Sequence, residues 1–335
     1  MKGKSRNRQI VLLTVFATIL VVIGHSDITD DFKALWIYKW VYSFHMPLFF
    51  FISGFLFCYT LPVEKLRNTT FLSFVKKKAI RLMIPFLFIN TVIFVIKSRM
   101  SDPAMMQNPV TLDWGSFLDS TFFNPMGFMW FLPTLFVIFA VLFLMYKYLK
   151  ISKIIGGWYL IFMFLAVIGM ATLSVFLPKI KFMQVSNAVY YASYFLTGII
   201  YCDYKTAVDR FLRKYWVVIG VLSLAASVSL MFSKYMAALS GICFSLVLSL
   251  LLEDKCSDTV VRFSAFSYTV FLLSYFPQML LRGPISHIFP SVNQYLLSVA
   301  SFVVGLAVPV IIGVIAMKLK ERSPRFKDIF KLIGI

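Results

Sequence analysis

Apolar residues along this chain gather in long runs separated by short polar and basic stretches. Most of the runs approach the 20 or so residues that a helix needs to cross the hydrocarbon core of a membrane. Lipid cannot hydrogen-bond the backbone and no barrel-like alternation is visible, so each run is predicted to be a helix. Ten segments follow from the pattern, at about 9–25, 41–61, 82–97, 127–146, 155–177, 187–201, 215–232, 235–252, 263–281 and 295–317. The prediction is an all-α fold, a polytopic membrane bundle of about ten transmembrane helices.

The composition favours lipid over water as the surroundings of this bundle. Apolar residues make up 60% of the 335 residues and charged residues 14%, and the mean hydropathy is +0.84. A net charge of +19 could suit nucleic acid, but the basic residues lie between the apolar runs and do not gather on one soluble face. We therefore expect no nucleic-acid partner. Residues 1–335 are predicted to form a single integral-membrane domain, whose basic cytoplasmic tail, 318–335, lies along anionic headgroups.

The distribution of basic residues predicts the topology. With the N-terminus inside, 25 of the 33 basic residues fall in inner segments, so both termini are expected in the cytoplasm and the protein in the cell (plasma) membrane. The basic start of the chain resembles a signal peptide, but no A-x-A-like cleavage site precedes His25, which predicts an uncleaved first helix. The loop at 97–126 is then external. Its polar and aromatic residues suit either an acceptor-binding loop or a solvated connector: Asp102, Asp113, Trp114 and Asp119.

Histidine is the side chain best suited to exchange protons near neutral pH, and two of the three histidines end neighbouring predicted spans. His25 closes the first span and His45 opens the second, both on the outer side. Either residue could act in catalysis, or simply occupy a helix end that water reaches. His287 lies in a loop bounded by prolines and is expected to be a surface residue.

A basic cluster opens the third span on the inner side. Lys78 and Arg81 are three residues apart and share a helix face, so they could bind a phosphate-bearing ligand or could only mark the cytoplasmic side. Inside the predicted spans, Asn90 and Gln278 should face the bundle interior, where they can find hydrogen-bond partners. No Asp or Glu falls within any predicted span, which weakens a proton-coupled transporter. The four cysteines have neither paired nor CxxC spacing, so they are expected to be packing residues and no metal site is predicted.

Five motifs give the chain a more specific resemblance. GHS, FHMPLFFFISGFLF, KAIRLMIPF, WFLPTLF and SYTVFLLSYFPQ occur in this order, at residues 24–26, 44–57, 78–86, 130–136 and 267–278. With the ten-span plan, they resemble the acyltransferase-3 family over nearly the whole chain. The similarity is greatest to the fucose 4-O-acetylase-like branch of that family.

This resemblance implies an integral-membrane enzyme that moves an acyl group, usually acetyl from cytoplasmic acetyl-CoA, to a hydroxyl of an extracytoplasmic or cell-surface glycan. His25 falls on the family's essential histidine, and Lys78 and Arg81 fall on a basic pair thought to meet the phosphates of coenzyme A. Trp130 falls on a conserved aromatic. Many members carry a histidine near Ser274. The chain departs from the family at Thr14, where a basic residue is usual eleven positions before the histidine, so donor contacts there are expected to differ.

The expected chemistry has His25 as a general base that takes the proton of a sugar hydroxyl as the hydroxyl attacks the thioester of acetyl-CoA or another acyl-CoA. Ser26, Asn90 and Gln278 are candidate donors to the oxyanion. His45 is expected to act beside His25 or toward the acceptor. Direct transfer and a covalent acyl-histidine both remain open. The alternative function is a glycan or lipid flippase or exporter, which would use the same long spans and basic inner face without acyl transfer.

Overall fold

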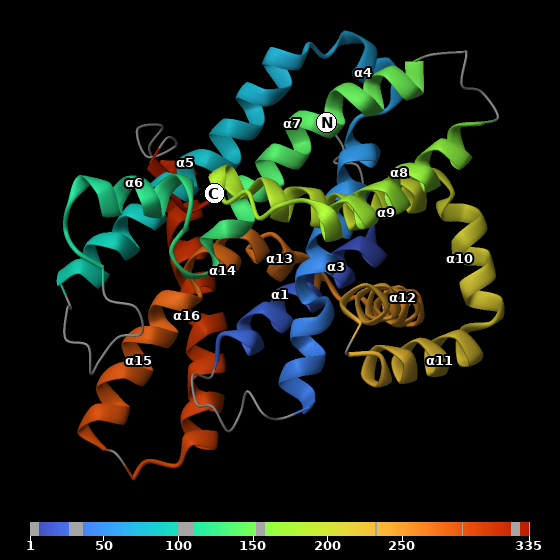
Figure 1. The fold of residues 1–335 in the computed structure, drawn as a ribbon. Helices are drawn as coiled ribbons and strands as arrows, with labels where there is room; N and C mark the ends of the chain where they lie inside the picture. The colour runs from blue at the N-terminus through green and yellow to red at the C-terminus, as the bar shows by residue number, and fades with distance from the viewer. Residues whose placement is uncertain are drawn as a thin grey trace.

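The computed structural model describes residues 7–26, 36–99, 110–151, 158–231, 233–289, 291–322 and 329–334. Every regular element in these ranges is helical, and they contain no strand. Asp102 and residues 323–328 of the predicted tail lie outside the described residues. In chain order, the elements drawn in Figure 1 include α1 (Arg8–Gly24), α3 (Trp36–Thr60), α4 (Val63–Asn68), α5 (Phe71–Arg99), α6 (Trp114–Phe122), η1 (Gly127–Trp130), α7 (Phe131–Ile151), α8 (Tyr159–Phe176), η3 (Phe182–Gln184) and α9 (Val185–Asp203). They continue with α10 (Lys205–Lys214), α11 (Trp216–Ser229), α12 (Lys234–Leu252), η4 (Glu253–Lys255), α13 (Asp258–Ser264), α14 (Ser267–Leu273), α15 (Tyr275–Ile288), α16 (Gln294–Arg322) and η5 (Phe330–Ile333).

Each predicted apolar segment coincides with a helix or with a group of consecutive helices, so the all-α membrane bundle is confirmed. The number of spans is a separate matter. In the described ranges, six helices are long and apolar enough to cross a membrane, and two bent pairs would raise the number to eight. α1 is apolar but only 17 residues long. A count of ten spans is therefore not established.

Two of the predicted segments differ in shape from simple spans. α10 meets α11 at 94°, and α13 meets the helices that follow it at 48°. α5 also begins eleven residues before the predicted segment at 82–97, because lysine and arginine are good helix formers and continue the helix into the polar region. Lys78 and Arg81 consequently lie on one rigid helix together with Asn90.

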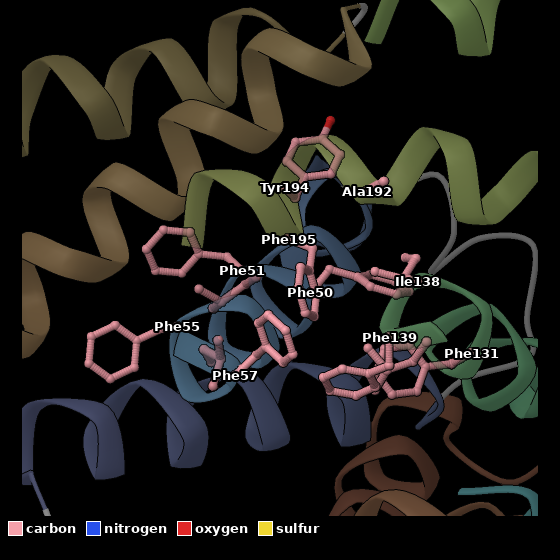
Figure 2. Packing of buried hydrophobic residues seen from close by; sticks show 14 of the residues in the cluster. Phe50, Phe51, Phe55, Phe57, Phe131, Ile138, Phe139, Ala192, Tyr194 and Phe195 are labelled. Atoms are coloured by element: carbon pink, nitrogen blue, oxygen red, sulfur yellow. The ribbon is translucent and has the colours of Figure 1, made fainter. Parts of the chain in front are cut away.

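α3 lies at the centre of the bundle and packs against α9 with unusually close backbones. A Cβ built on Gly54 would lie 1.9 Å from the carbonyl oxygen of Phe195, and one built on Gly198 would lie 2.0 Å from that of Phe51. Glycine is needed at both places, since small residues let helix backbones approach in membranes. Around this crossing the core is largely aromatic, and Figure 2 shows Phe50, Phe51 and Phe57 of α3 beside Phe195 of α9.

Charged pairs mark one end of the bundle, which we call the charged end. Lys150 at the end of α7 pairs with Asp203 at the end of α9 at 2.7 Å, and Arg213 of α10 pairs with Glu253 after α12. α1 begins at this end, because Gln9 donates a hydrogen bond to Tyr201 of α9. The charged end holds many of the basic residues whose bias predicts the cytoplasmic side.

The opposite end is marked by the start of α3 and the end of α1, where the Tyr42 hydroxyl donates to the Gly24 carbonyl at 2.9 Å. We call it the histidine end. Between the two ends, apolar side chains point outward. On α8, for example, Leu165 is 61% exposed and Phe176 is 81% exposed. Such a surface suits lipid rather than water.

Candidate active site

A cavity of about 570 Å³ opens at the charged end between α1, α3, α5, α7 and α14. We call it the donor cavity. Its walls are mostly aromatic and aliphatic, including Phe131, Leu135 and Phe271. Polar side chains enter it from four helices: Asn7, Thr14, Ser53, Lys78, Arg81 and Ser267. The structure thus brings together Thr14, Lys78 and Arg81, which sequence reasoning singled out from different segments.

The two cations of the donor cavity rest against aromatic rings. Lys78 Nζ lies 3.5 Å from the centroid of the Phe139 ring, and the Arg81 guanidinium carbon lies 5.8 Å from that of Tyr268. Tyr268 also donates its hydroxyl proton to the Arg81 carbonyl at 2.7 Å. In the described part of the chain, no carboxylate pairs with either cation. Both charges are therefore free to bind an anionic ligand.

His25 lies at the histidine end, directly after the last residue of α1. Its backbone N–H donates to the carbonyls of Val21 and Val22, which completes the helix end, and the residue is half-buried. Its ring packs against two aromatic side chains. The ring centroids lie 5.6 Å from Phe128 and 6.1 Å from Tyr275. The imidazole is thus held between η1 and α15.

Aromatic rings separate His25 from the donor cavity. Phe271 lines the cavity, and its ring lies 5.7 Å from the ring of Phe128 in edge contact. Phe128 in turn touches both His25 and Tyr275. We call Phe128, Phe271 and Tyr275 the aromatic partition. These rings form a continuous series of contacts from the wall of the donor cavity to His25.

A buried polar cluster fixes the chain beside His25. Gln278 Nε2 donates to the Val22 carbonyl at 3.1 Å and to Ser26 Oγ at 3.3 Å, while the Ser26 hydroxyl donates to the same carbonyl at 2.6 Å. Gly305 of α16 makes room for this amide, since a Cβ there would lie 2.5 Å from Nε2. Gln278 faces the bundle interior, as predicted. Ser274 differs from Ser26. The residue is only 1% exposed, and its buried hydroxyl has no hydrogen-bond partner.

His45 lies on the same side of the bundle as His25. Its Nδ1 donates to the Val41 carbonyl at 2.9 Å, which leaves Nε2 as an acceptor, and its ring meets Tyr42 edge-on at 4.9 Å. His45 and Arg282 both lie near His25. Arg282 is 5% exposed and donates from Nε to the Gln278 carbonyl at 3.3 Å. Nothing in the sequence pattern drew attention to this arginine.

Asn90 and Trp130 take positions away from the imidazole. Asn90 Nδ2 donates to the Ser120 carbonyl at 3.0 Å, and its Oδ1 accepts the Met126 N–H at 2.8 Å. It faces the interior, as predicted, and it fixes the start of η1, which delivers Phe128 to His25. Trp130 stacks on Tyr191 at 5.3 Å between ring centroids.

Sequence reasoning missed the aromatic partition and Arg282. An aromatic side chain in an apolar run gives no sign that it faces a site, and a single arginine near a span end is common. The four cysteines are free, and the described residues contain no group of three or more His, Cys, Asp or Glu side chains that could hold a metal ion. The side chain of His287 lies outside what the structure describes.

Comparison with known proteins places this arrangement in a family. A family model described as an acyltransferase domain matches residues 8–317, from the first residue of α1 into the last long helix. The chain belongs to the acyltransferase-3 family. The aromatic partition, His25 and most of the lining of the donor cavity lie within the matched residues of this family member.

Among curated proteins, this acyltransferase-3 member is similar to the nodulation protein NolL of Mesorhizobium japonicum. The two are 30% identical over 129 residues, which is 37% of this chain and 31% of NolL. The chain therefore matches less than a third of the length of that relative. No solved structure matches the chain.

Proposed function

We propose that this acyltransferase-3 member is an O-acyltransferase that moves an acyl group, most simply acetyl, from acyl-CoA to a hydroxyl of a glycan, with His25 as general base. One observation carries the proposal: α1 links a cavity with two free cations to a half-buried histidine. Thr14 lines the cavity and His25 follows eleven residues later, about 16 Å along the helix axis. A donor with an anionic head and a long arm fits this separation.

Coenzyme A has both parts. Its phosphates would bind Lys78 and Arg81 at the mouth of the donor cavity, where charge-assisted hydrogen bonds are strong. Its flexible pantetheine arm would run between the apolar side chains of Phe131, Leu135 and Phe271 toward His25. The rings of the aromatic partition would have to move apart for the thioester to reach His25. When closed, they would keep water away from the thioester.

The reaction we propose is a direct acyl transfer. The imidazole of His25 takes the proton of the acceptor hydroxyl as the oxygen attacks the thioester carbonyl carbon. The carbon–sulfur bond then breaks, and the thiolate of coenzyme A leaves and takes up the proton from the imidazolium. A positioned base contributes about 10² to 10⁴-fold to the rate of such a step.

The oxyanion of the intermediate needs a donor near His25. Asn90 is engaged with Ser120 and Met126, and the two amide protons of Gln278 are engaged with Val22 and Ser26. Ser274 is a candidate with a buried hydroxyl that binds no other group, and it directly precedes Tyr275, which packs on His25. We propose Ser274 as the donor, with Gln278 and Ser26 holding the helix end in place.

Titration of coenzyme A into the protein in lipid nanodiscs tests the donor site. The double variant Lys78→Met with Arg81→Met should lose affinity by about tenfold for each cation, because each would remove a charge-assisted hydrogen bond. Lys76→Met with Lys77→Met is the matched control. Those lysines lie on the same helix turn, are exposed and do not line the donor cavity.

Equal loss of affinity in both double variants would mean that the cluster acts through general positive charge, and the donor site would be wrong. Unchanged affinity in both would remove coenzyme A from this cavity altogether.

A further inference from the structure

A second hollow, of about 670 Å³, lies at the histidine end, where α5, α6 and η1 meet. Its size falls within the range of small-molecule sites. We call it the α5–α6 cleft. Its lining includes Lys97, Ser116, Asp119, Asn124, Met126 and Gly127.

The α5–α6 cleft lies beside His25 and away from the donor cavity. Gly127 lines the cleft, and the next residue is Phe128, whose ring packs on His25. Lys97 follows Arg81 by sixteen residues on α5, about 24 Å along the axis. One helix thus connects the donor cations to the cleft, and Figure 1 shows α5 running toward α6. A ligand in the cleft would approach His25 from the side opposite to the donor.

The lining of the cleft is suited to hydroxyl groups. Each oxygen of the Asp119 carboxylate accepts a hydrogen bond from Asn124 Nδ2 at 2.9 Å. Both oxygens keep further lone pairs that can accept hydrogen bonds from a ligand. Lys97 has no ion pair or hydrogen bond of its own in the described structure. The cleft therefore offers a carboxylate that accepts and an ammonium that donates, and the two are not paired with each other.

The cleft is also preorganised. Asp113 caps α6 by accepting the Ser116 N–H at 2.9 Å, and hydroxyl donors from Thr111 and Ser116 help to hold the pKa of its carboxyl near 2. The Met126 N–H donates to Asn90, which fixes the other wall. Trp114 begins α6, directly before Gly115 of the lining, and is 78% exposed. A flat indole of this kind can receive the C–H face of a sugar ring.

We infer that the α5–α6 cleft binds the acceptor as a neutral, hydroxyl-rich carbohydrate unit. Asp119 accepts hydrogen bonds from neighbouring hydroxyls, and Lys97 donates to another. Asp119 and Lys97 carry opposite charges, so the pair gives the cleft no net charge that would select a uronate or a protonated amino sugar over a neutral ring. This assignment rests on the proposed function, since it supplies the hydroxyl that His25 deprotonates.

Saturation-transfer NMR with methyl glycosides tests the inference in the full-length protein in nanodiscs. The probes are a neutral methyl hexoside, a methyl uronoside and a methyl amino-sugar glycoside. We expect the neutral probe to bind, and Asp119→Asn and Lys97→Met each to weaken it about tenfold, because each removes a hydrogen bond to a charged group. Arg99→Met is the matched control, since Arg99 is an exposed cation two residues from Lys97 that does not line the cleft.

Coenzyme A affinity, measured on the same samples, reports whether each variant is folded. If it is unchanged while both cleft variants bind the neutral glycoside like wild type, the inference is wrong. Stronger binding of the uronoside or amino sugar than of the neutral probe overturns it as well. The proposed function fails separately, when wild-type protein that binds coenzyme A transfers no acyl group to any glycan.

Gly127→Asn supplies an independent variant. Gly127 has a φ of +56°, which asparagine tolerates, and nothing lies within 4 Å of a Cβ built there, so the new side chain would occupy open space at the cleft. It should weaken glycoside binding at least tenfold and leave coenzyme A affinity unchanged. Wild-type glycoside affinity in this variant would count against the cleft.

Discussion

Replacing Gly198 by alanine should push α3 and α9 apart, because the new Cβ would stand 2.0 Å from the Phe51 carbonyl oxygen and 2.9 Å from the Phe55 nitrogen. Both contacts are with backbone, so no side chain can turn away to relieve them. A Cβ on Gly54 of α3 would also clash with backbone, since it would lie 1.9 Å from the Phe195 carbonyl oxygen of α9. The crossing is therefore closed to any larger residue on either helix.

The magnitude follows from the displacement required. Ordinary contact begins at 3.4 Å, so the backbones would have to separate by about 1.4 Å, or tilt to the same effect. Overpacking costs about 1–3 kcal/mol, and a backbone clash of this size belongs in the upper part of that range, at about 2–3 kcal/mol, while alanine gains about 1 kcal/mol over glycine in a helix. We expect a net loss of about 1–2 kcal/mol, and a comparable loss for Gly54→Ala.

Thermal stability in detergent, followed by fluorescence-detected size-exclusion chromatography, measures this loss. Gly169→Ala on α8 is the matched control, because nothing lies within 4 Å of a Cβ built at Gly169. The control should be as stable as wild type or slightly more so, and Gly198→Ala should lose its folded peak at a lower temperature. If Gly198→Ala is as stable as Gly169→Ala, α3 and α9 are not packed as described.

Three further predictions concern the site. Asn90→Leu should lower acyl transfer at least tenfold with unchanged coenzyme A affinity, since it releases η1; parallel loss of both would indicate general misfolding. Thr14→Arg should tighten coenzyme A binding several-fold in a titration, because it adds a third cation to the donor cavity; weaker binding would mean that no phosphate lies near α1. Phe271→Ala should raise acceptor-independent hydrolysis of acetyl-CoA, measured as free thiol, by opening the aromatic partition to water, and an unchanged rate would mean that these rings do not exclude water.

The helices could be predicted from the sequence because the backbone of an apolar run in lipid has to form its hydrogen bonds within the run, and a helix does this. The number of spans could not. The bend between α10 and α11 falls where Tyr215 joins an amphipathic helix to an apolar one, and no proline or glycine marks it. The short α1 is a second reason why the number of spans could not be predicted. The helices that α1 packs against, and not its length, decide its position in the bundle.

Several residues that line the donor cavity could be singled out from the sequence. Lys78 and Arg81 are charges at a span entrance, and Thr14 was notable as a departure from the family pattern, so each carried a signal in the sequence. At the histidine end, the sequence drew attention to the histidines but not to the rings packed around His25. Phe128 reaches His25 because Asn90 fixes Met126, a contact between residues 36 positions apart that only the folded chain reveals.

The central claim is that His25 is the base for acyl transfer from acyl-CoA to a glycan hydroxyl. The most direct test incubates membranes that contain the protein with acetyl-CoA labelled in the acetyl group and follows the label into glycan. We expect transfer by wild type and at least a hundredfold lower rate for His25→Gln, with its coenzyme A affinity retained. Transfer at the wild-type rate by His25→Gln would contradict the claim, and glycan export without any labelled glycan would favour an exporter.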